Sequence, residues 1–257
     1  MDLGIAGRVA VVAASTSGLG QAVATALAAE GTRVVVSGRR GDRAREIAAG
    51  FPDAVGVEAD LAAPDGPRRL IEAAVAAFGQ VDILVLNGPG PRPSLAADVT
   101  DADLTAAIDS LLLAQQRLIA QALPGMRQRR WGRLLAIGSS GVAVPLPGLA
   151  LSNAGRAALA AYLKTLAAEV AADGITVNML LPGRIATDRV AQLDAARAAR
   201  EHRPVAEVET ASRASIPLGR YGAPAEFGAV AAFLCGAGAA YVTGATVRCD
   251  GGLIPAV

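Results

Sequence analysis

Short apolar runs rich in β-branched residues alternate with longer segments of helical period along the whole chain. The runs lie at residues 8–13, 33–37, 54–59, 81–86, 133–137, 176–181 and 246–249, and the helical segments at 19–30, 42–49, 65–78, 101–129, 151–172 and 224–234. Strands separated in this way by helical crossovers pair in parallel and are covered by helices. The pattern therefore predicts an α/β fold, with one doubly wound, Rossmann-type parallel sheet of about seven strands and helices on both faces.

The chain shows no linker that divides it, and α/β folds of about 250 residues are commonly a single unit. We therefore expect residues 1–257 to form one dinucleotide-binding domain. Residues 185–216 are polar, rich in arginine and without a strand pattern. Such an excursion over the carboxyl edge of a sheet predicts a mobile lid above the active-site crevice.

Composition excludes several classes of protein. Apolar residues make up 53% of the chain, which excludes intrinsic disorder, and the net charge of +1 comes without blocks of like charge, so we expect no nucleic-acid partner. The uncharged stretch 227–247 is long enough to cross a membrane, but Gly236, Gly238 and Gly244 divide it into a helix, a turn and a strand. We expect no membrane association.

Two cysteines, Cys235 and Cys249, are too few for a disulfide framework or a four-ligand metal site. Free thiols are typical of a reducing compartment, so we expect a cytoplasmic protein without a metal. Groups that transfer protons are also scarce, because the chain has one histidine, His202, and one lysine, Lys164.

Glycine and polar residues follow three of the predicted strands. The first strand leads into Ser15, Thr16, Ser17, Gly18, Leu19 and Gly20, the third into Asp60 and Leu61, and the fourth into Asn87 and Gly88. Glycines between a strand and a helix let backbone N–H groups approach a pyrophosphate, and ligands bind where the carboxyl ends of strands meet. Tight turns alone would explain each segment, but the agreement of three strand ends favours a nucleotide site.

The end of the second strand indicates which nucleotide. NAD enzymes place a carboxylate there for the ribose hydroxyls, whereas the 2′-phosphate of NADP calls for a cation. This chain has Ser37-Gly38-Arg39-Arg40. We therefore expect NADP(H), held mainly by Arg39, with NAD(H) as the alternative and a solvated helix start as the reading without a ligand.

These motifs resemble those of the short-chain dehydrogenase/reductase family along nearly the whole chain, and most of all its 3-oxoacyl-acyl-carrier-protein reductase branch. The family's T-G-x-x-x-G-x-G stands here as Ala13-Ala14 with Gly18-Leu19-Gly20, and its N-x-x-x-P-G with a following Thr as Asn178, Pro182, Gly183 and Thr187. The resemblance implies that Asp60 contacts adenine and that Pro182, Gly183 and Thr187 lie near the nicotinamide. It also implies a homodimer or homotetramer built on the long helices and the last strand.

The family's catalytic set of Asn, Ser and Tyr-x-x-x-Lys is mostly absent. Alignment on the flanking motifs puts Leu111 at the Asn position, Ser139 at the serine, Ser152 at the tyrosine and Arg156 at the lysine. An aliphatic hydroxyl is a much weaker acid than a phenol, and arginine does not deprotonate. The family's proton relay is therefore expected to fail here, while Arg156 keeps the donors to hold the nicotinamide ribose or an acidic ligand.

Three functions stay open on the sequence alone. The first is a divergent NADP(H)-dependent oxidoreductase that acts on a carbonyl or hydroxyl group of a small molecule. In it, Ser139 and Ser152 hold the oxygen and the proton comes from water or from a lid residue such as His202. The second is a catalytically silent NADP(H)-binding protein, and the third is an oligomeric scaffold. The first is slightly favoured, because the serine that polarises the carbonyl remains.

Overall fold

Seven parallel strands form one sheet in the order β3-β2-β1-β4-β5-β6-β7 in the computed structural model, which describes residues 2–255. The strands are β1 (Val9–Val12), β2 (Arg33–Gly38), β3 (Ala54–Glu58), β4 (Ile83–Leu86), β5 (Gly132–Ile137), β6 (Ile175–Pro182) and β7 (Thr246–Cys249). The order reverses between β1 and β4, which is where a doubly wound sheet opens a crevice at its carboxyl edge. The predicted fold class and all seven predicted strands are confirmed.

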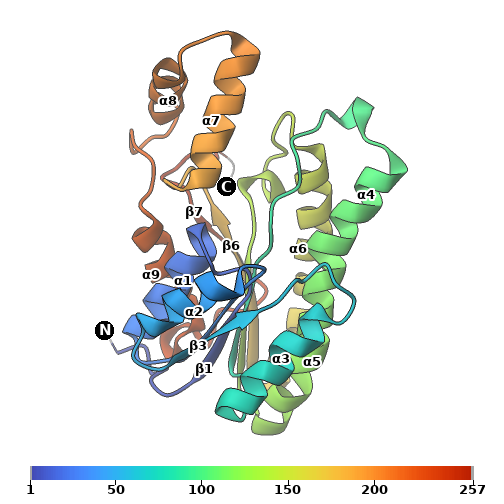
Figure 1. Cartoon of the computed structure of the whole chain (residues 1–257), viewed down its shortest axis with the longest axis vertical. Coiled ribbons are helices and arrows are strands. Elements are labelled where there is room, and N and C mark those ends of the chain that lie inside the picture. Colours follow the sequence, from blue (N-terminus) through green and yellow to red (C-terminus); the bar gives the residue numbers. More distant parts are fainter. Residues whose placement is uncertain (1, 256–257) are drawn as a thin grey trace.

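Helices cover both faces of this sheet (Figure 1). One face carries α1 (Gly18–Ala29), α2 (Gly41–Ala49) and α9 (Pro224–Cys235), and the other carries α3 (Gly66–Phe78), α5 (Ala114–Arg129) and α6 (Ala150–Val170). The three strands β1, β2 and β4 read as nearly continuous apolar runs because both their faces are buried.

Successive strand residues contribute to two separate cores. Val11 and Leu84 belong to the core beneath α3, α5 and α6, whereas Val12 and Val85 belong to the core beneath α1, α2 and α9. Packing is tight enough on the second face that a Cβ on Gly228 of α9 would lie 2.7 Å from the carbonyl oxygen of Ala22 in α1. Burial on both sides holds the carboxyl ends of the central strands in fixed positions.

The prediction of one helix over 101–129 was wrong in its middle. The segment divides into α4 (Asp101–Ile108), a π-helical stretch (Asp109–Leu113) and α5. Leu111 in the π-helical stretch is buried and packs against Gly155 of α6. Single π-helical turns inside α-helices are rare and occur frequently at functional sites.

The predicted lid consists of α7 (Asp188–Glu201) and α8 (Val205–Ala214), which stand above the carboxyl edge of the sheet in Figure 1. The stretch 227–247 divides as predicted into α9, a turn and the approach to β7. No helix within residues 2–255 combines the length and apolar character that a membrane crossing needs.

Candidate active site

The loop after β1 contacts two of the predicted nucleotide residues, Gly20 and Asn87. The side-chain amide of Asn87, at the end of β4, donates hydrogen bonds to the carbonyl oxygens of Ala13 (3.2 Å) and Ala14 (3.1 Å). A Cβ on Gly20 would lie 2.6 Å from the Ala14 oxygen and 2.7 Å from the Asn87 amide nitrogen. A side chain at position 20 would collide with both groups, so the glycine at the start of α1 allows the loop after β1 to pack against α1 and Asn87.

Ala14 has φ 47°, in the left-handed region that glycine adopts without cost. The family has glycine at this position, so the substitution leaves the loop conformation in place and adds local strain and a methyl group. Ser15 is fully buried and braces the loop: its hydroxyl donates to Val12 (2.7 Å), and its N–H donates to the Ser37 carbonyl (2.7 Å). Its polar groups are therefore already bonded within the fold.

Three residues of the loop remain suited to a ligand. Ser17 is exposed and precedes α1 without capping the helix through its side chain, while Gly18 and Leu19 are half-buried. The first N–H groups of a helix lack intrahelical partners and attract anions. Across the crevice, a Cβ on Gly18 would lie 4.0 Å from the Thr187 methyl group, so the loops after β1 and β6 meet.

An open hollow of about 700 Å³ lies at the ends of β2 and β3. It is lined by Arg39, Arg40, Gly41, Asp42, Arg43, Glu46 and Glu58. Arg40 donates to the Thr16 carbonyl (3.4 Å), which attaches the hollow to the glycine loop. The Arg39 side chain is exposed, as expected for a group that would meet a phosphate.

The sequence interpretation missed the acidic residues of this hollow. Asp42 and Glu46 are paired with Arg45 (2.6 Å) and Arg43 (2.6 Å). Glu58 reaches the hollow from β3, and no ion pair neutralises it within residues 2–255. A neighbouring strand supplied this carboxylate, so inspection of the second strand alone did not reveal it. Two guanidiniums thus face one unpaired carboxylate.

The other predicted nucleotide residues line the same edge. Asp60 is exposed and accepts a hydrogen bond from the Ala62 N–H (3.0 Å), while Leu61 is buried beneath it. Gly88 lies against Gln115, whose amide nitrogen is 3.3 Å from a Cβ built there. These positions lie at the ends of β3 and β4, as the sequence predicted.

On the far side of the crevice, the end of β6 is joined to β7. The Gly183 N–H donates to the Cys249 carbonyl (2.9 Å), and a Cβ on Gly183 would lie 2.5 Å from the Asp250 Cα. Pro182 ends the strand at the same point, and Asn178 bonds Val242 (2.7 Å). Gly183 and Asn178 thus fix the path of the chain toward Thr187.

Ser139 and Ser152 come from the end of β5 and the first turn of α6. The Ser139 oxygen accepts a hydrogen bond from the Gly141 N–H (3.1 Å), which leaves its own proton free to donate. Ser152 is half-buried, and its hydroxyl makes no hydrogen bond to any residue in the described part of the chain. Asn153 binds both backbone groups of Leu146 and holds the loop between the two serines. The arrangement offers two hydroxyl donors to an oxygen in the crevice.

Arg156 lies one helical turn beyond Ser152 and points back to the sheet. Its Nη1 donates to the Ile137 carbonyl (2.7 Å), two residues before Ser139. Burial, with a smaller contribution from the charge of Arg189, lowers the pKa of Arg156 to about 10. A group with this pKa stays protonated at neutral pH, so Arg156 serves as a fixed cation and not as a proton carrier.

Leu111, which the sequence motifs put at the position of the family's asparagine, lies against α6. A Cβ on Gly155 would lie 2.7 Å from a Leu111 methyl group, so the two helices are in direct contact there. An apolar side chain buried in this contact holds no water and transfers no proton. The assignment of Leu111, Ser152 and Arg156 to the relay positions of the family stays a prediction from the sequence motifs.

Neither of the two scarce proton carriers stands in the crevice. His202 is exposed and ends α7, whose 14 residues extend it about 20 Å from Thr187 at 1.5 Å per residue. Lys164 lies two turns beyond Arg156, and its ammonium group binds the Gly244 carbonyl (3.0 Å). The sequence-based suggestion of His202 as an acid is not supported by this position.

Two residues of the predicted lid make contacts that the sequence did not indicate. Arg189, in the first turn of α7, donates to the Pro91 carbonyl (3.1 Å) of the loop after β4. Asp194 is 1% exposed and binds Arg184, Ser212 and the Tyr221 hydroxyl (2.7 Å), which ties α7 to α8 and to the body. The sequence gives no signal that singles out Asp194, because Asp188, Glu201, Glu207 and Glu209 stand in the same arginine-rich segment.

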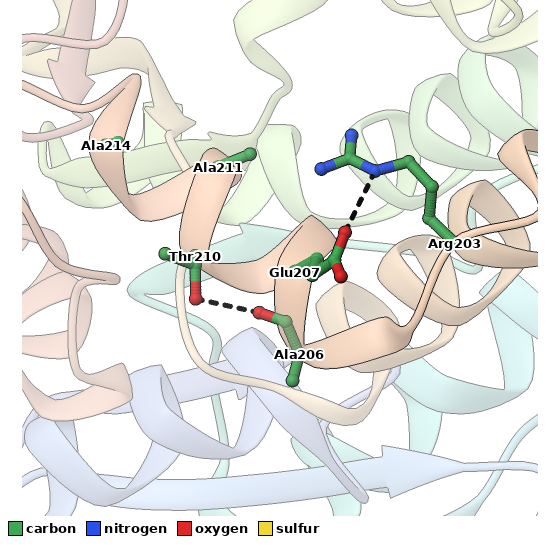
Figure 2. Close-up of a pocket in the computed structure, with 6 residues that line it drawn as sticks. All are labelled: Arg203, Ala206, Glu207, Thr210, Ala211 and Ala214. Carbon is green, nitrogen blue, oxygen red and sulfur yellow. Dashed lines mark hydrogen bonds and ion pairs between the residues drawn. The ribbon is translucent and has the colours of Figure 1, made fainter.

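A second hollow, of about 450 Å³, lies on the outer side of α8 (Figure 2). Its lining is Arg203, Ala206, Glu207, Thr210, Ala211 and Ala214. Arg203 and Glu207 pair with each other (3.5 Å), and the Thr210 hydroxyl bonds the Ala206 carbonyl (2.8 Å). Its polar groups are satisfied within α8 and its surroundings, which makes the crevice the stronger candidate site.

Residues 13–254 match the family model described as enoyl-(acyl carrier protein) reductase. The chain belongs to the short-chain dehydrogenase/reductase family. It is 35% identical over 254 residues to a 3-oxoacyl-[acyl-carrier-protein] reductase of Synechocystis sp., covering 96% of this chain and 97% of that protein. It is 31% identical to 3-oxoacyl-[acyl-carrier-protein] reductase FabG of Vibrio cholerae, covering 98% and 99%.

Solved structures of this family superpose closely on the chain. L-sorbose reductase from Gluconobacter frateurii, solved with NADPH and L-sorbose, has a TM-score of 0.94 at 31% identity over the full length of both chains. YwfH, an NADPH-dependent reductase involved in bacilysin biosynthesis, has a TM-score of 0.92 at 28% identity, covering 98% of this chain and all of that one. The family resemblance inferred from the motifs is thereby confirmed.

Proposed function

We propose that the chain is an NADP(H)-dependent oxidoreductase that reduces a carbonyl group, or oxidises the corresponding hydroxyl, by an altered proton relay. The observation that carries this proposal is the meeting of a glycine loop and two serine hydroxyl donors at one edge of the sheet. Gly20 and Asn87 shape the nucleotide side, and Ser139 and Ser152 stand on the other side. Binding of NADPH to L-sorbose reductase, a protein of the same fold, agrees with this proposal.

The residues of the crevice fit a dinucleotide. The start of α1 has backbone N–H groups without intrahelical partners that suit a pyrophosphate, and Asp60 is exposed at the rim where adenine would lie. Arg39 and Arg40 supply two positive charges for a 2′-phosphate against the single unpaired carboxylate of Glu58. When bound, NADPH supplies the hydride.

The side chains of this protein then have to manage a developing alkoxide. Ser139 and Ser152 donate hydrogen bonds to the substrate oxygen, and the charge of Arg156 favours the negative charge that forms there. Because residues 2–255 place no phenol, lysine or imidazole beside these serines, the alkoxide takes its proton from water. Lid closure by α7 and α8 has to leave a path for that water.

Turnover tests this proposal. The oxidation of NADPH by the protein is followed by the absorbance of the reduced nicotinamide, with ketones, diketones and β-ketoacyl thioesters as candidate substrates. We expect reduction of at least one class, with loss of most activity in Ser139→Ala. Arg130→Ala, at the opposite end of the sheet, is the control, because the Ala172 carbonyl is the one hydrogen-bond partner of its guanidinium within residues 2–255. Activity unchanged in Ser139→Ala contradicts the assignment of that serine.

A catalytically silent NADP(H)-binding protein is the second candidate, favoured by the apolar contact of Leu111 with Gly155. The double variant Ser152→Tyr/Arg156→Lys distinguishes the two. If the crevice accepts a substrate and only the relay is altered, the double variant raises the reduction rate. If the wild type and the double variant both bind NADPH without turnover, the silent NADP(H)-binding function is favoured. If neither protein binds NADPH, the oligomeric scaffold is the remaining function.

We also propose a homo-oligomer assembled on the α4–α6 side. Leu104 and Leu113 are 41% and 39% exposed on this side, and Tyr241, near the last strand, is fully exposed. Large apolar groups exposed together on helices are typical of protein interfaces. Sedimentation velocity is expected to show a dimer or tetramer, and a monomer at all concentrations overturns this proposal.

A further inference from the structure

Arg189 reaches from the lid to the opposite side of the crevice. From the first turn of α7, its Nη2 donates a hydrogen bond to the Pro91 carbonyl (3.1 Å) in the loop after β4. Its Nη2, Cζ and Nε lie 3.4, 3.8 and 3.8 Å from a Cβ built on Gly90, so the whole guanidinium lies against this loop. Within residues 2–255, no other hydrogen bond or ion pair joins α7 or α8 to residues before 184.

This contact crosses the carboxyl end of β5. The chain enters α7 from β6 and reaches Pro91 from β4, and these two strands are the neighbours of β5 in the sheet. Strands are spaced about 4.8 Å apart, so the contact joins loops whose strands are about 10 Å apart. Ser139 follows two residues after the end of β5. The bridge of Arg189 and Pro91 therefore lies across the carboxyl edge at the strand that carries Ser139.

The loop that carries the acceptor is held in place. Pro89, Pro91 and Pro93 fix φ at every second residue of this loop. The N–H of Ser94 then donates to the Gly148 carbonyl (2.8 Å), which joins the loop to the segment before α6. The Pro91 carbonyl is therefore a fixed point, and movement at this contact belongs to the lid.

The lid is held far more firmly at its base than at Arg189. Asp194 is 1% exposed and binds Arg184 and the Tyr221 hydroxyl, which stand on either side of the lid in the sequence. Arg189, by contrast, is exposed and donates to a neutral carbonyl. A single exposed hydrogen bond contributes little net stability, and breaking a buried ion pair costs much more. The contact with Pro91 therefore breaks before the base does.

We propose that Arg189 is a gate over the chemical side of the crevice. When its hydrogen bond to Pro91 is made, the lid covers the way to Ser139, and the lid opens by breaking this bond while Asp194 holds its base. This inference rests on the proposed reductase function and adds control of entry and release to the same site. Because the bond joins two parts of the protein and not a ligand, its loss speeds entry and release alike and leaves affinity unchanged.

Access to position 139 tests the gate without a nucleotide. Ser139→Cys places a thiol after β5, and peptide mapping by mass spectrometry follows its modification by N-ethylmaleimide, an uncharged reagent. We expect the added change Arg189→Met to speed up this modification by about five-fold, which is the worth of one net hydrogen bond. Arg200→Met is the matched control, because Arg200 is exposed near the far end of the same helix. Equal rates with and without Arg189→Met overturn the proposal.

Stopped-flow fluorescence of NADPH distinguishes a gate from a contact with the ligand. In a chain with Ser139 intact, Arg189→Met is expected to raise the association and dissociation rate constants by the same factor of about five, with the Kd changed by less than about two-fold. Loss of a positive charge alone has the opposite effect on association, because it slows the approach of an anionic nucleotide. Faster dissociation with weaker binding assigns Arg189 to the nucleotide and overturns the gate, and so do unchanged rate constants.

The two measurements separate the gate from the function on which it rests. If the wild-type protein binds no NADPH, the reductase function fails, while the modification rate at position 139 still decides for or against the gate. Arg189→Lys keeps a charged donor without the planar fork, so its rates are expected to lie between those of the wild type and Arg189→Met. Thermal melting of each variant confirms folding, and Arg189→Lys keeps the test valid if Arg189→Met fails to fold.

Discussion

The two sides of the crevice differ in what they require from the sequence. The nucleotide side depends on backbone shape, and it accepts Ala14 with φ 47° in place of the family glycine. The chemical side depends on particular functional groups, and there the sequence motifs predict Leu111, Ser152 and Arg156 at the positions of the relay residues. A fold can therefore keep the geometry of a cofactor site while its proton chemistry is replaced, because different parts of the sequence specify each.

Glycine at position 20 is the strictest requirement on the nucleotide side. Gly20→Ala places a methyl group against the Ala14 oxygen and the Asn87 amide, which forces the loop to move. We expect NADPH affinity to fall by about 100-fold or more and unfolding free energy by about 2–4 kcal/mol. Fluorescence titration and urea unfolding measure these quantities. Gly50→Ala is the control, since Gly50 has φ −83° and a Cβ there meets only Ile47, at 3.4 Å.

A Gly20→Ala variant that binds NADPH like the wild type would show that the loop adapts. The nucleotide side would then tolerate substitutions as well as the chemical side does, and the two sides would not differ in what they require from the sequence. A parallel loss in Gly50→Ala would show general instability as the cause.

Asp194 tests how the lid is held over the chemical side. Asp194→Asn removes the charge facing Arg184 and leaves that cation without its partner. Breaking a buried pair of this kind costs about 3 kcal/mol or more. We expect faster proteolysis within residues 188–214 and a lower melting temperature. Ser212→Ala, which removes a weaker contact (3.4 Å), is expected to change both far less. Equal protease resistance in Asp194→Asn contradicts a lid anchored by this residue.

Glu58 is expected to affect the preference for NADPH over NADH. Its carboxylate opposes Arg39 and Arg40 in the hollow at the ends of β2 and β3. Glu58→Gln removes repulsion toward a 2′-phosphate, so NADPH is expected to bind about two- to five-fold more tightly while NADH stays unchanged. Glu72→Gln, on α3, is the control, since its partner Arg68 lies one turn away on the same helix. If Glu58→Gln binds NADH more tightly, or binds neither nucleotide more tightly, the 2′-phosphate does not lie in this hollow.

Ala14→Gly is expected to have the smallest effect. It removes left-handed strain at the loop and gains about 0.5–1 kcal/mol of stability after the entropy of the glycine is counted. NADPH is expected to bind slightly more tightly, because a methyl group leaves the loop. Differential scanning calorimetry measures the melting temperature, and a destabilised variant contradicts the presence of strain at Ala14.

Much of the fold followed from local patterns, because strand and helix periods are properties of consecutive residues. The seven runs, the glycine loop at Gly18 and Gly20, and the replaced tyrosine at Ser152 were all visible in the sequence. The π-helical stretch was not, since it shows itself in the packing of Leu111 on Gly155 of another helix.

Contacts between distant segments also escaped sequence reasoning. Glu58 approaches Arg39 because β3 pairs with β2, and Arg189 contacts Pro91 because α7 returns to the loop after β4. Within the sequence both appear as ordinary charged residues. The burial of Asp194 depends on α7, α8 and Tyr221 together, so no local pattern predicted it.

The most direct test of the central claim is the affinity of the wild-type protein for the two nucleotides. Fluorescence titration of NADPH and NADH, repeated with Arg39→Ala, measures whether the nucleotide side is intact and what it selects. We predict that NADPH binds at least about ten-fold more tightly than NADH and that Arg39→Ala removes most of this difference. Equal affinities for the two nucleotides, or no binding of either, would contradict it.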